Sequence, residues 1–208
     1  MPRGRTRTFD TDAALERAVD LFARRGYEGT SIAELTAVMG INPPSLYAAY
    51  GNKRKLFDLV VERYAEHRRA YLEDVMGQPT ARLAAQRFLE GAAEHDTAPG
   101  EPRGCLTVQG GLATNVEDQE VAAFLAERRA ANQDVLQRRL EQGVTDGDLP
   151  AETDCVALAR YLCTLSQGIS VQASGGASRE QLLEVAALAL AAMPQVAGEP
   201  AAALLDAS

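Results

Sequence analysis

The chain has 208 residues, of which 46% are hydrophobic and 24% charged, and its formal net charge is −8. This length and apolar fraction allow a hydrophobic core and exclude a largely disordered chain. No apolar run reaches the length of a membrane span, and no apolar stretch follows the arginines at the start of the chain. We therefore expect a cytoplasmic protein without a secretory signal.

Charge is distributed unevenly along the chain. Residues 1–56 contain nine Lys and Arg against six Asp and Glu, whereas the remaining residues contain twelve against twenty-three. A basic N-terminal segment on an acidic body indicates an anionic partner at that end of the molecule.

The sequence offers no recognisable set of residues for catalysis or for holding a metal. The three cysteines form no CxxC pair, and the two histidines, His67 and His95, lie far apart. Neither a Gly-rich phosphate loop nor a nucleophile–base set is present. We therefore expect no disulfide framework, no metal, no cofactor and no enzyme activity.

Apolar residues recur at helical spacing and alternating strand patterns are absent, which predicts an all-α fold. In the first helix they follow the i, i+3, i+4, i+7 pattern from Leu15 to Phe22, and Gly26 ends the helix. Ser31 and the glutamate three residues later fit a capping box, which predicts a short second helix that ends at Gly40.

Two further helices follow directly. Asn42 is a good N-cap, which predicts a short third helix over Pro43–Tyr50. Asn52 is predicted to cap a long fourth helix from Lys53 to about Met76. A first helix followed by two short ones with a tight turn between them is the helix-turn-helix pattern, whose second member enters the major groove of DNA.

The remainder of the chain is also predicted to be helical, which gives about nine helices in all. The later helices are predicted at about Thr80–His95, Gly104–Thr114, Val116–Gly143, Ala151–Gln172 and Ser178–Met193.

The segment AALERAVDLFARRGYEGTSIAELTAVMGINPPSLYAAYGNKRKLF, within Phe9–Phe57, resembles the N-terminal domain of the TetR/AcrR family of regulators. The resemblance implies a homodimer that binds a palindromic operator, most often as a repressor that a small-molecule effector releases. It also implies an arm and DNA-binding domain over residues 1–52 and a ligand-binding and dimerisation domain over 53–195. Residues 196–208 are expected to form a flexible tail.

The residues expected to contact DNA lie around the second and third helices. Thr30 and Ser31 are expected to cap the second helix, whose N-terminus can face a phosphate. Lys53 opposes the dipole of the helix that it begins, and phosphate binding would explain that cost. The predicted set is Thr30, Ser31, Asn42, Pro43, Pro44, Ser45, Tyr47, Ala48 and Lys53, with Arg3, Arg5 and Arg7 as a basic arm or, alternatively, a disordered tail.

The third helix has an unusual beginning for base recognition. Pro43 and Pro44 lack backbone donors, and Ala48 has no polar group. We therefore expect recognition to depend partly on apolar contact with thymine methyl groups and on DNA shape. Leu46 and Tyr50, four residues apart, are expected to face the core instead.

The resemblance places an effector pocket among the later helices, beginning with the fourth. Cys105 lies near a predicted helix N-terminus, which favours a reactive thiolate, so it is either a sensor of oxidants or electrophiles or a small packing residue beside the pocket. The residues with suitable chemistry for the pocket are Tyr64, Arg68, Tyr71, Phe88, Cys105, Gln109, Asn115, Phe124, Tyr161 and Gln167.

The last two helices are expected to form a four-helix dimer interface across a two-fold axis. The alternative is that they pack only within one chain. Two other classes of protein stay open beside the regulator, namely an enzyme and an architectural DNA-binding protein that senses no ligand. The predicted interface residues are Leu158, Leu162, Leu165, Leu183, Ala186 and Leu190.

Overall fold

The computed structural model describes residues 10–112 and 119–196, with every side chain in these ranges except those of 111 and 112. These ranges contain ten helices and no strand, which confirms the predicted all-α fold. The predicted arginine arm, Asn115 and residues 197–208 of the predicted tail lie outside them. The helices are α1 (Thr11–Arg25), α2 (Ile32–Met39), α3 (Pro43–Tyr50), α4 (Lys53–His67), α5 (Arg69–Met76), α6 (Ala81–Asp96), α7 (Leu106–Leu112), α8 (Gln119–Asp146), α9 (Cys155–Ser174) and α10 (Arg179–Ala191).

The first four helices begin where polar side chains cap them. The side chains of Asp10, Asn42 and Asn52 accept hydrogen bonds from backbone N–H groups two or three residues further along, at 2.8–3.1 Å. Ser31 and Glu34 form the predicted capping box ahead of α2. Each cap satisfies an N–H group that has no acceptor inside its own helix.

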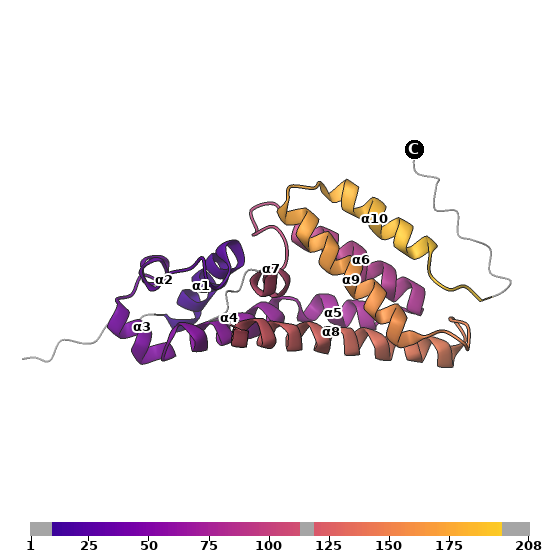
Figure 1. Cartoon of the computed structure of the whole chain (residues 1–208), viewed down its shortest axis with the longest axis horizontal. Helices are drawn as coiled ribbons and strands as arrows, with labels where there is room; N and C mark the ends of the chain where they lie inside the picture. The colour runs from indigo at the N-terminus through magenta and orange to yellow at the C-terminus, as the bar shows by residue number, and fades with distance from the viewer. Residues whose placement is uncertain (1–9, 113–118, 197–208) are drawn as a thin grey trace, which may run out of the picture.

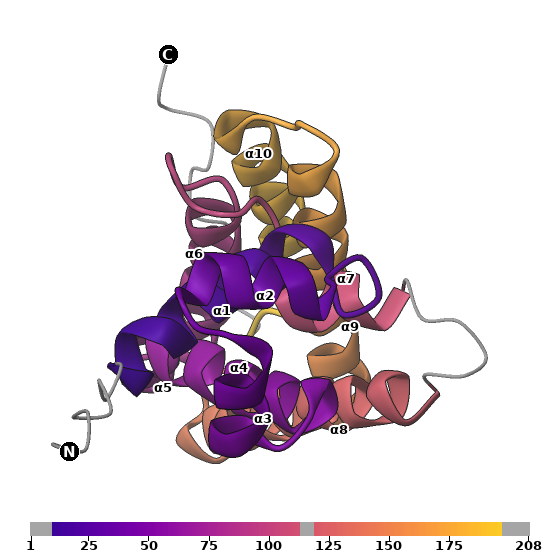
Figure 2. The same ribbon diagram turned by 90° about the vertical axis from the view of Figure 1, so that its left-hand side faces the viewer.

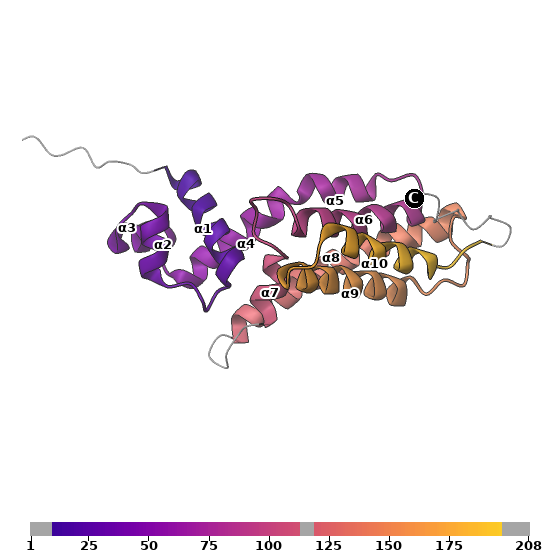
Figure 3. The same ribbon diagram turned by 90° about the horizontal axis from the view of Figure 1, so that it is seen from above.

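The molecule is elongated, with α1, α2 and α3 at one end (Figure 1). Helix α4 leads from this end into the larger part of the molecule, where α6 packs against α9 and α10, and α8 packs against α9. Helix α7 lies at the junction and contacts α1, α4, α8 and α9 (Figure 3). No helix in the described ranges is long and apolar enough to cross a membrane.

The predicted single helix from Lys53 to about Met76 is wrong, because the chain breaks the helix at Arg68. The backbone of Arg68 has φ −91° and ψ −2°, and its N–H bonds to the carbonyl of Glu66 instead of a carbonyl four residues back. The Arg68 guanidinium donates to the buried carboxylate of Asp96 at 2.6 Å. The apolar periodicity of residues 53–76 carries no information about a contact with Asp96, so the sequence pattern alone predicts an unbroken helix.

Two hydrophobic clusters form the core. The larger one joins α5, α6, α8, α9 and α10. The other is built on α1–α4, where the rings of Phe22, Tyr27 and Phe57 pack with centroids 5.0–6.3 Å apart. This N-terminal cluster also contains Leu106 of α7 and Leu125 of α8, both essentially buried. Its core therefore extends well beyond residue 52 in sequence.

Candidate functional site

The helix-turn-helix consists of α2, the turn at residues 40–42 and α3, and it forms the end of the molecule that faces the viewer in Figure 2. Gly40 ends α2 in the left-handed conformation, with φ 71° and ψ 30°, which side-chain-bearing residues rarely adopt. Leu46 and Tyr50 are buried as predicted, and the Tyr50 hydroxyl donates to the carbonyl of Thr11 at 3.0 Å. These contacts fix α3 against α1.

The other face of α3 is open to solvent. Tyr47 is 48% exposed, Ser45 is partly exposed, and the prolines and Ala48 are exposed. The side chain of Asn42 is occupied in part, because its oxygen accepts the N–H of Ser45 at 2.9 Å. The exposed face offers hydroxyl groups and apolar surface and carries no charged side chain.

The predicted cap at Thr30 is wrong, because Ser31 alone caps α2. Thr30 is fully buried, and its hydroxyl donates to the carbonyl of Gly26 at 2.8 Å. This bond closes the loop between α1 and α2, so the Thr30 side chain has no surface to offer a phosphate. Ser31 is exposed, and its hydroxyl lies 2.8 Å from a carboxylate oxygen of Glu34.

Lys53, at the first position of α4, lies beside the helix-turn-helix. Its Nζ is 4.2 Å from the centre of the Tyr27 ring, at a distance typical of a cation–π contact. The side chain is partly exposed. A cation held in this way at a helix N-terminus is positioned near the exposed end of the molecule, as phosphate binding requires.

Ion pairs and hydrogen bonds connect α1 to the rest of the chain. Arg63 of α4 pairs with Asp12 at 3.1 Å and with Glu16 at 2.8 Å, both on α1. Arg24, at the end of α1, donates to the carbonyl of Gly100 at 3.0 Å. Helix α1 is therefore held to the loop that precedes α7 as well as to α4.

A cavity of about 200 Å³ lies between α4, α5, α6, α7, α8 and α9. Six of the ten predicted pocket residues line it, namely Tyr64, Arg68, Tyr71, Phe88, Cys105 and Gln167. The lining residues that sequence reasoning missed include Thr107, Arg128, Arg129, Asn132, Ser166 and Ser170.

Three of the other four predicted pocket residues, Gln109, Phe124 and Tyr161, are described and do not line this cavity. Gln109 turns its amide to the carbonyl of Arg103 at 3.1 Å. The Phe124 ring lies between the guanidinium groups of Arg54 and Arg128, outside the cavity. Tyr161 is 39% exposed on the outer face of α9. Asn115 belongs to the undescribed segment 113–118.

A buried charge network lies against the cavity. Asp96, fully buried at the end of α6, accepts from Arg68 and from the hydroxyl of Ser170 on α9. Burial alone would lower the pKa of Arg68, but its neighbours, Tyr64 and the acidic Asp96 among them, raise it above the ordinary value. The guanidinium therefore stays charged, and the network joins the break between α4 and α5 to α6 and α9.

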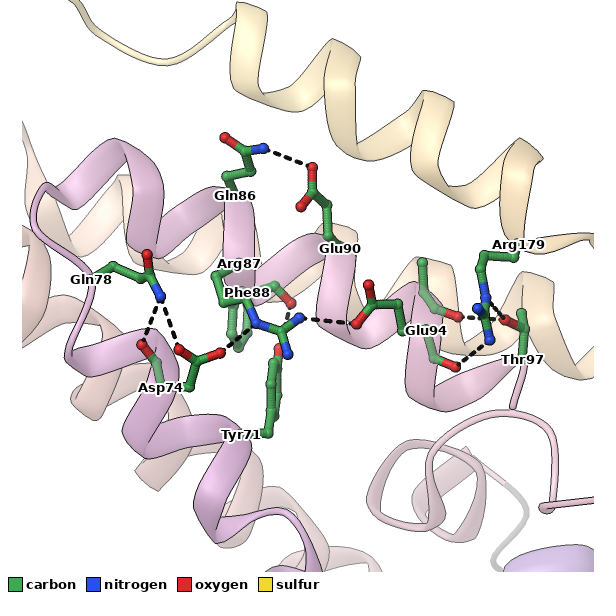
Figure 4. Close-up of polar contacts among 11 residues, drawn as sticks. Tyr71, Asp74, Gln78, Gln86, Arg87, Phe88, Glu90, Glu94, Thr97 and Arg179 are labelled. Atoms are coloured by element: carbon green, nitrogen blue, oxygen red, sulfur yellow. Dashed lines mark hydrogen bonds and ion pairs between the residues drawn. The ribbon is translucent and has the colours of Figure 1, made fainter. Parts of the chain in front are cut away.

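Tyr71 is held in the cavity wall by close packing and by a ladder of polar contacts (Figure 4). Its hydroxyl donates to the carbonyl of Phe88 at 2.5 Å. A Cβ at position 91 would lie 2.1 Å from the Tyr71 ring, so Gly91 is needed for this approach. Arg87 lies over the ring and bridges the carboxylates of Asp74 and Glu94.

Two buried polar atoms near the cavity have no hydrogen-bond partner in the described part of the chain. One is the Tyr64 hydroxyl, whose pKa burial raises well above its ordinary value. The other is Nε2 of His95, whose pKa is lowered by burial and then by the charge of Arg68. Unpartnered buried polar groups are costly in a native protein, so each calls for an explanation.

Cys105 lies on the cavity wall just ahead of α7. It is partly exposed, and its Sγ lies 3.2 Å from the hydroxyl of Thr107. The other two cysteines, Cys155 and Cys163, are buried in the core as the apolar pattern of α9 predicts. Burial raises the pKa of Cys163 to about 11.

Four of the six residues predicted for the dimer interface are buried in the core of a single chain, namely Leu158, Leu162, Ala186 and Leu190. The intrachain alternative holds for these four, because α9 and α10 use them to cover α6. Leu165 and Leu183 are only partly buried and stay predicted interface residues. The large apolar side chains exposed on these two helices are Val156, Tyr161, Val171, Val185 and Leu188.

Comparison with known proteins matches both parts of the chain. Residues 14–60 match the family described as bacterial regulatory proteins, tetR family, and residues 79–189 match the tetracyclin repressor-like C-terminal domain. The HTH-type transcriptional repressors ComR and BdcR of Escherichia coli (strain K12) are 33% and 31% identical to the chain. The alignments cover 93% of this chain and of ComR, and 89% of this chain and 90% of BdcR.

Solved structures are similar over nearly the whole chain. A cysteine-substituted form of the TetR family transcriptional regulator CifR, complexed with 26-bp double-strand operator DNA, is 42% identical with a TM-score of 0.88. The match covers 92% of this chain and 100% of that one. A putative TetR regulator from Rhodococcus sp. RHA1 is 48% identical with a TM-score of 0.61, over 88% and 98% of the two chains. The chain therefore belongs to the tetR family of bacterial regulatory proteins, and it is a DNA-binding transcriptional regulator rather than an enzyme.

Proposed function

We propose that the protein is a homodimeric, cytoplasmic repressor that leaves a palindromic operator when a small-molecule effector enters the cavity. The observation that carries this proposal is the course of α4. The helix begins at Lys53 beside the helix-turn-helix, and its last two turns place Tyr64 on the cavity wall. Helix α4 thus contributes to both the DNA-binding end and the cavity, so a ligand that moves the C-terminal end of α4 also moves the DNA-binding surface.

The DNA contacts are assigned to the exposed residues around α2 and α3. Ser31, Asn42, Ser45 and Tyr47 supply polar groups for phosphates and base edges, and Lys53 supplies a cation. The prolines and Ala48 are assigned apolar contact with DNA. The structure of CifR with operator DNA, which shares this fold, supports the assignment. The arm residues Arg3, Arg5 and Arg7 remain candidates for the minor groove.

The dimer surface is assigned to the exposed apolar face of α9 and α10. Leu188, in the last turn of α10, is 74% exposed, and Val156, Val171 and Val185 are also exposed. A dimer formed through this face must present its two copies of α3 to successive major grooves, roughly 34 Å apart, to bind a palindromic operator.

Ligand binding acts as a population shift between two spacings of the recognition helices. The effector favours the spacing that does not fit the operator only by as much as it binds that state better. The contacts from α1 to Arg63 and from Arg24 to the loop before α7 are the connections that such a shift must move or carry.

Selection from random double-stranded DNA with the purified protein, followed by sequencing of the bound fraction, tests this function. Enrichment of an inverted repeat supports a dimeric regulator. No enrichment, at low as well as at moderate salt, would contradict sequence-specific binding. An operator that no compound releases would instead favour the architectural alternative.

A second candidate function is a thiol switch at Cys105. The observation in its favour is the position of the thiol, which is partly exposed, lines the cavity and lies next to Thr107. Cys105→Ser would then abolish release of the operator by oxidants or electrophiles and leave DNA affinity unchanged, with Cys163→Ser as the control. A Cys105→Ser protein that still responds would exclude the switch.

A further inference from the structure

The charge of the cavity wall is one-sided. Three arginines, Arg68, Arg128 and Arg129, line the cavity, and none of its described lining residues is an aspartate or a glutamate. Arginine in a low-dielectric site is stable only when something compensates its charge. The three therefore need to be considered one by one.

Two of the three arginines have carboxylate partners outside the lining. Arg68 pairs with the buried Asp96 at 2.6 Å. Arg128 lies 3.5 Å from Glu62 and packs on the ring of Phe124, at the outer edge of the cavity.

Arg129 differs from them. It donates to the backbone carbonyl of Thr107, and no carboxylate in the described ranges lies within ion-pair distance of it. The wall thus carries one cation that a neutral acceptor satisfies only in part.

A second group of the same wall also lacks a partner. The hydroxyl of Tyr64 is buried and meets hydrogen-bond geometry with no described residue, while the thiol of Cys105 lies near enough to act on its pKa. Because burial raises its pKa, the hydroxyl stays protonated and is a donor. Both groups line the same cavity, as do Thr107, whose backbone carbonyl accepts from Arg129, and Cys105, whose Sγ lies beside the Thr107 hydroxyl.

The rest of the cavity is apolar and small. Val61, Leu72, Phe88, Ala92 and Val108 contribute hydrocarbon surface. A cavity of about 200 Å³ has room for a small organic molecule with an apolar body.

We propose that the effector of this cavity is a small monocarboxylate whose carboxylate group binds Arg129 and the Tyr64 hydroxyl and whose apolar body fills the remaining space. One negative charge matches Arg129, which has no carboxylate partner among the described residues, and a cation would find no acidic group among the described lining residues. The proposal rests on the proposed function in so far as it calls this ligand the effector.

Isothermal titration calorimetry on the full-length protein tests the ligand class directly. The probes are aliphatic and aromatic monocarboxylates of five to ten non-hydrogen atoms, each compared with its carboxamide and with the corresponding primary amine. We expect a carboxylate to bind about 10- to 100-fold more tightly than its carboxamide, the loss typical of one charge-assisted contact. The amine is expected not to bind.

Variants assign the contact to residues. Arg129→Gln is expected to remove the preference for carboxylate over carboxamide, and Arg129→Lys to restore part of it. Tyr64→Phe, which deletes only the unpartnered hydroxyl, is expected to weaken carboxylate binding about 10-fold without loss of folding. Arg138→Gln, an exposed arginine of the same helix, is the matched control and is expected to change nothing.

Three results would overturn the proposal. They are equal binding of a carboxylate and its carboxamide, carboxylate binding that Arg129→Gln leaves unchanged, and no binding by any carboxylate of the series. Release of the selected operator, measured in parallel, separates the two levels. Release of the operator by a neutral or cationic compound would support the proposed function and contradict the carboxylate ligand. Carboxylate binding by a protein for which no operator is found would contradict the proposed function alone.

Discussion

Removal of the buried carboxylate of Asp96 is expected to destabilise the protein strongly. In Asp96→Ala the Arg68 guanidinium loses its ion-pair partner, and the Ser170 hydroxyl keeps only the carbonyl of Ser166 as an acceptor, at 3.1 Å. Removing one partner of a buried ion pair typically lowers the free energy of unfolding by about 3–5 kcal/mol. The side chain of Arg68 is 20% exposed and that of Asp96 is fully buried, so water can solvate part of the unpaired guanidinium. We therefore expect a loss of about 3 kcal/mol, at the lower end of the range.

Replacement of both partners of the ion pair gives the sharper test. Replacing both partners, as in Arg68→Met with Asp96→Leu, leaves no uncompensated charge and is expected to cost far less than the two single changes together. Urea unfolding followed by circular dichroism gives the free energy of unfolding of the parent, Arg68→Met, Asp96→Leu, the double variant and Asp96→Ala. A double variant whose loss equals the sum of the single losses, or an Asp96→Ala protein within about 0.5 kcal/mol of the parent, would refute the reasoning.

Three further predictions concern DNA, assembly and pH. Lys53→Gln is expected to weaken operator binding and to reduce the slope of log K against log salt by about 2 per dimer in a fluorescence titration, whereas Arg138→Gln leaves the slope unchanged. Leu188→Glu is expected to convert the dimer into monomers in size-exclusion chromatography with light scattering, and Leu83→Glu, an equally apolar exposed site on α6, is the control. Burial lowers the pKa of His95 in the folded chain, so the unfolded chain binds a proton at this residue more readily. The free energy of unfolding therefore falls as the pH drops below 6.5. Between pH 7.5 and 5.5 the free energy of unfolding should therefore fall less in His95→Gln than in the parent. An equal fall in both proteins would contradict this assignment.

The local part of the fold is predictable from the sequence. Caps and stops act within a few residues, so Ser31, Asn42 and Gly40 determine the ends of α2 and α3 without reference to the rest of the chain. The inward position of Leu46 and Tyr50 follows in the same way from helical periodicity.

Features that depend on contacts between distant residues are not predictable in this way. Arg68, at the break between α4 and α5, pairs with a residue 28 positions away, and the charge of the cavity wall comes in part from arginines of α8 that look like surface residues in a helical pattern. The burial of four predicted interface residues was missed for a related reason. Apolar side chains also occur on the outer side of α9 and α10, and periodicity alone cannot say which side covers α6.

The composition of the N-terminal core has a consequence for how the protein is made and how it can be recombined. Leu106 and Leu125 complete that core, so a ribosome must synthesise the chain past residue 125 before the DNA-binding end can close its interior. For the same reason, a chimera that exchanges only residues 1–52 between relatives separates this core from part of its lining. An exchange that carries α7 and the start of α8 along with the DNA-binding end keeps the interior intact.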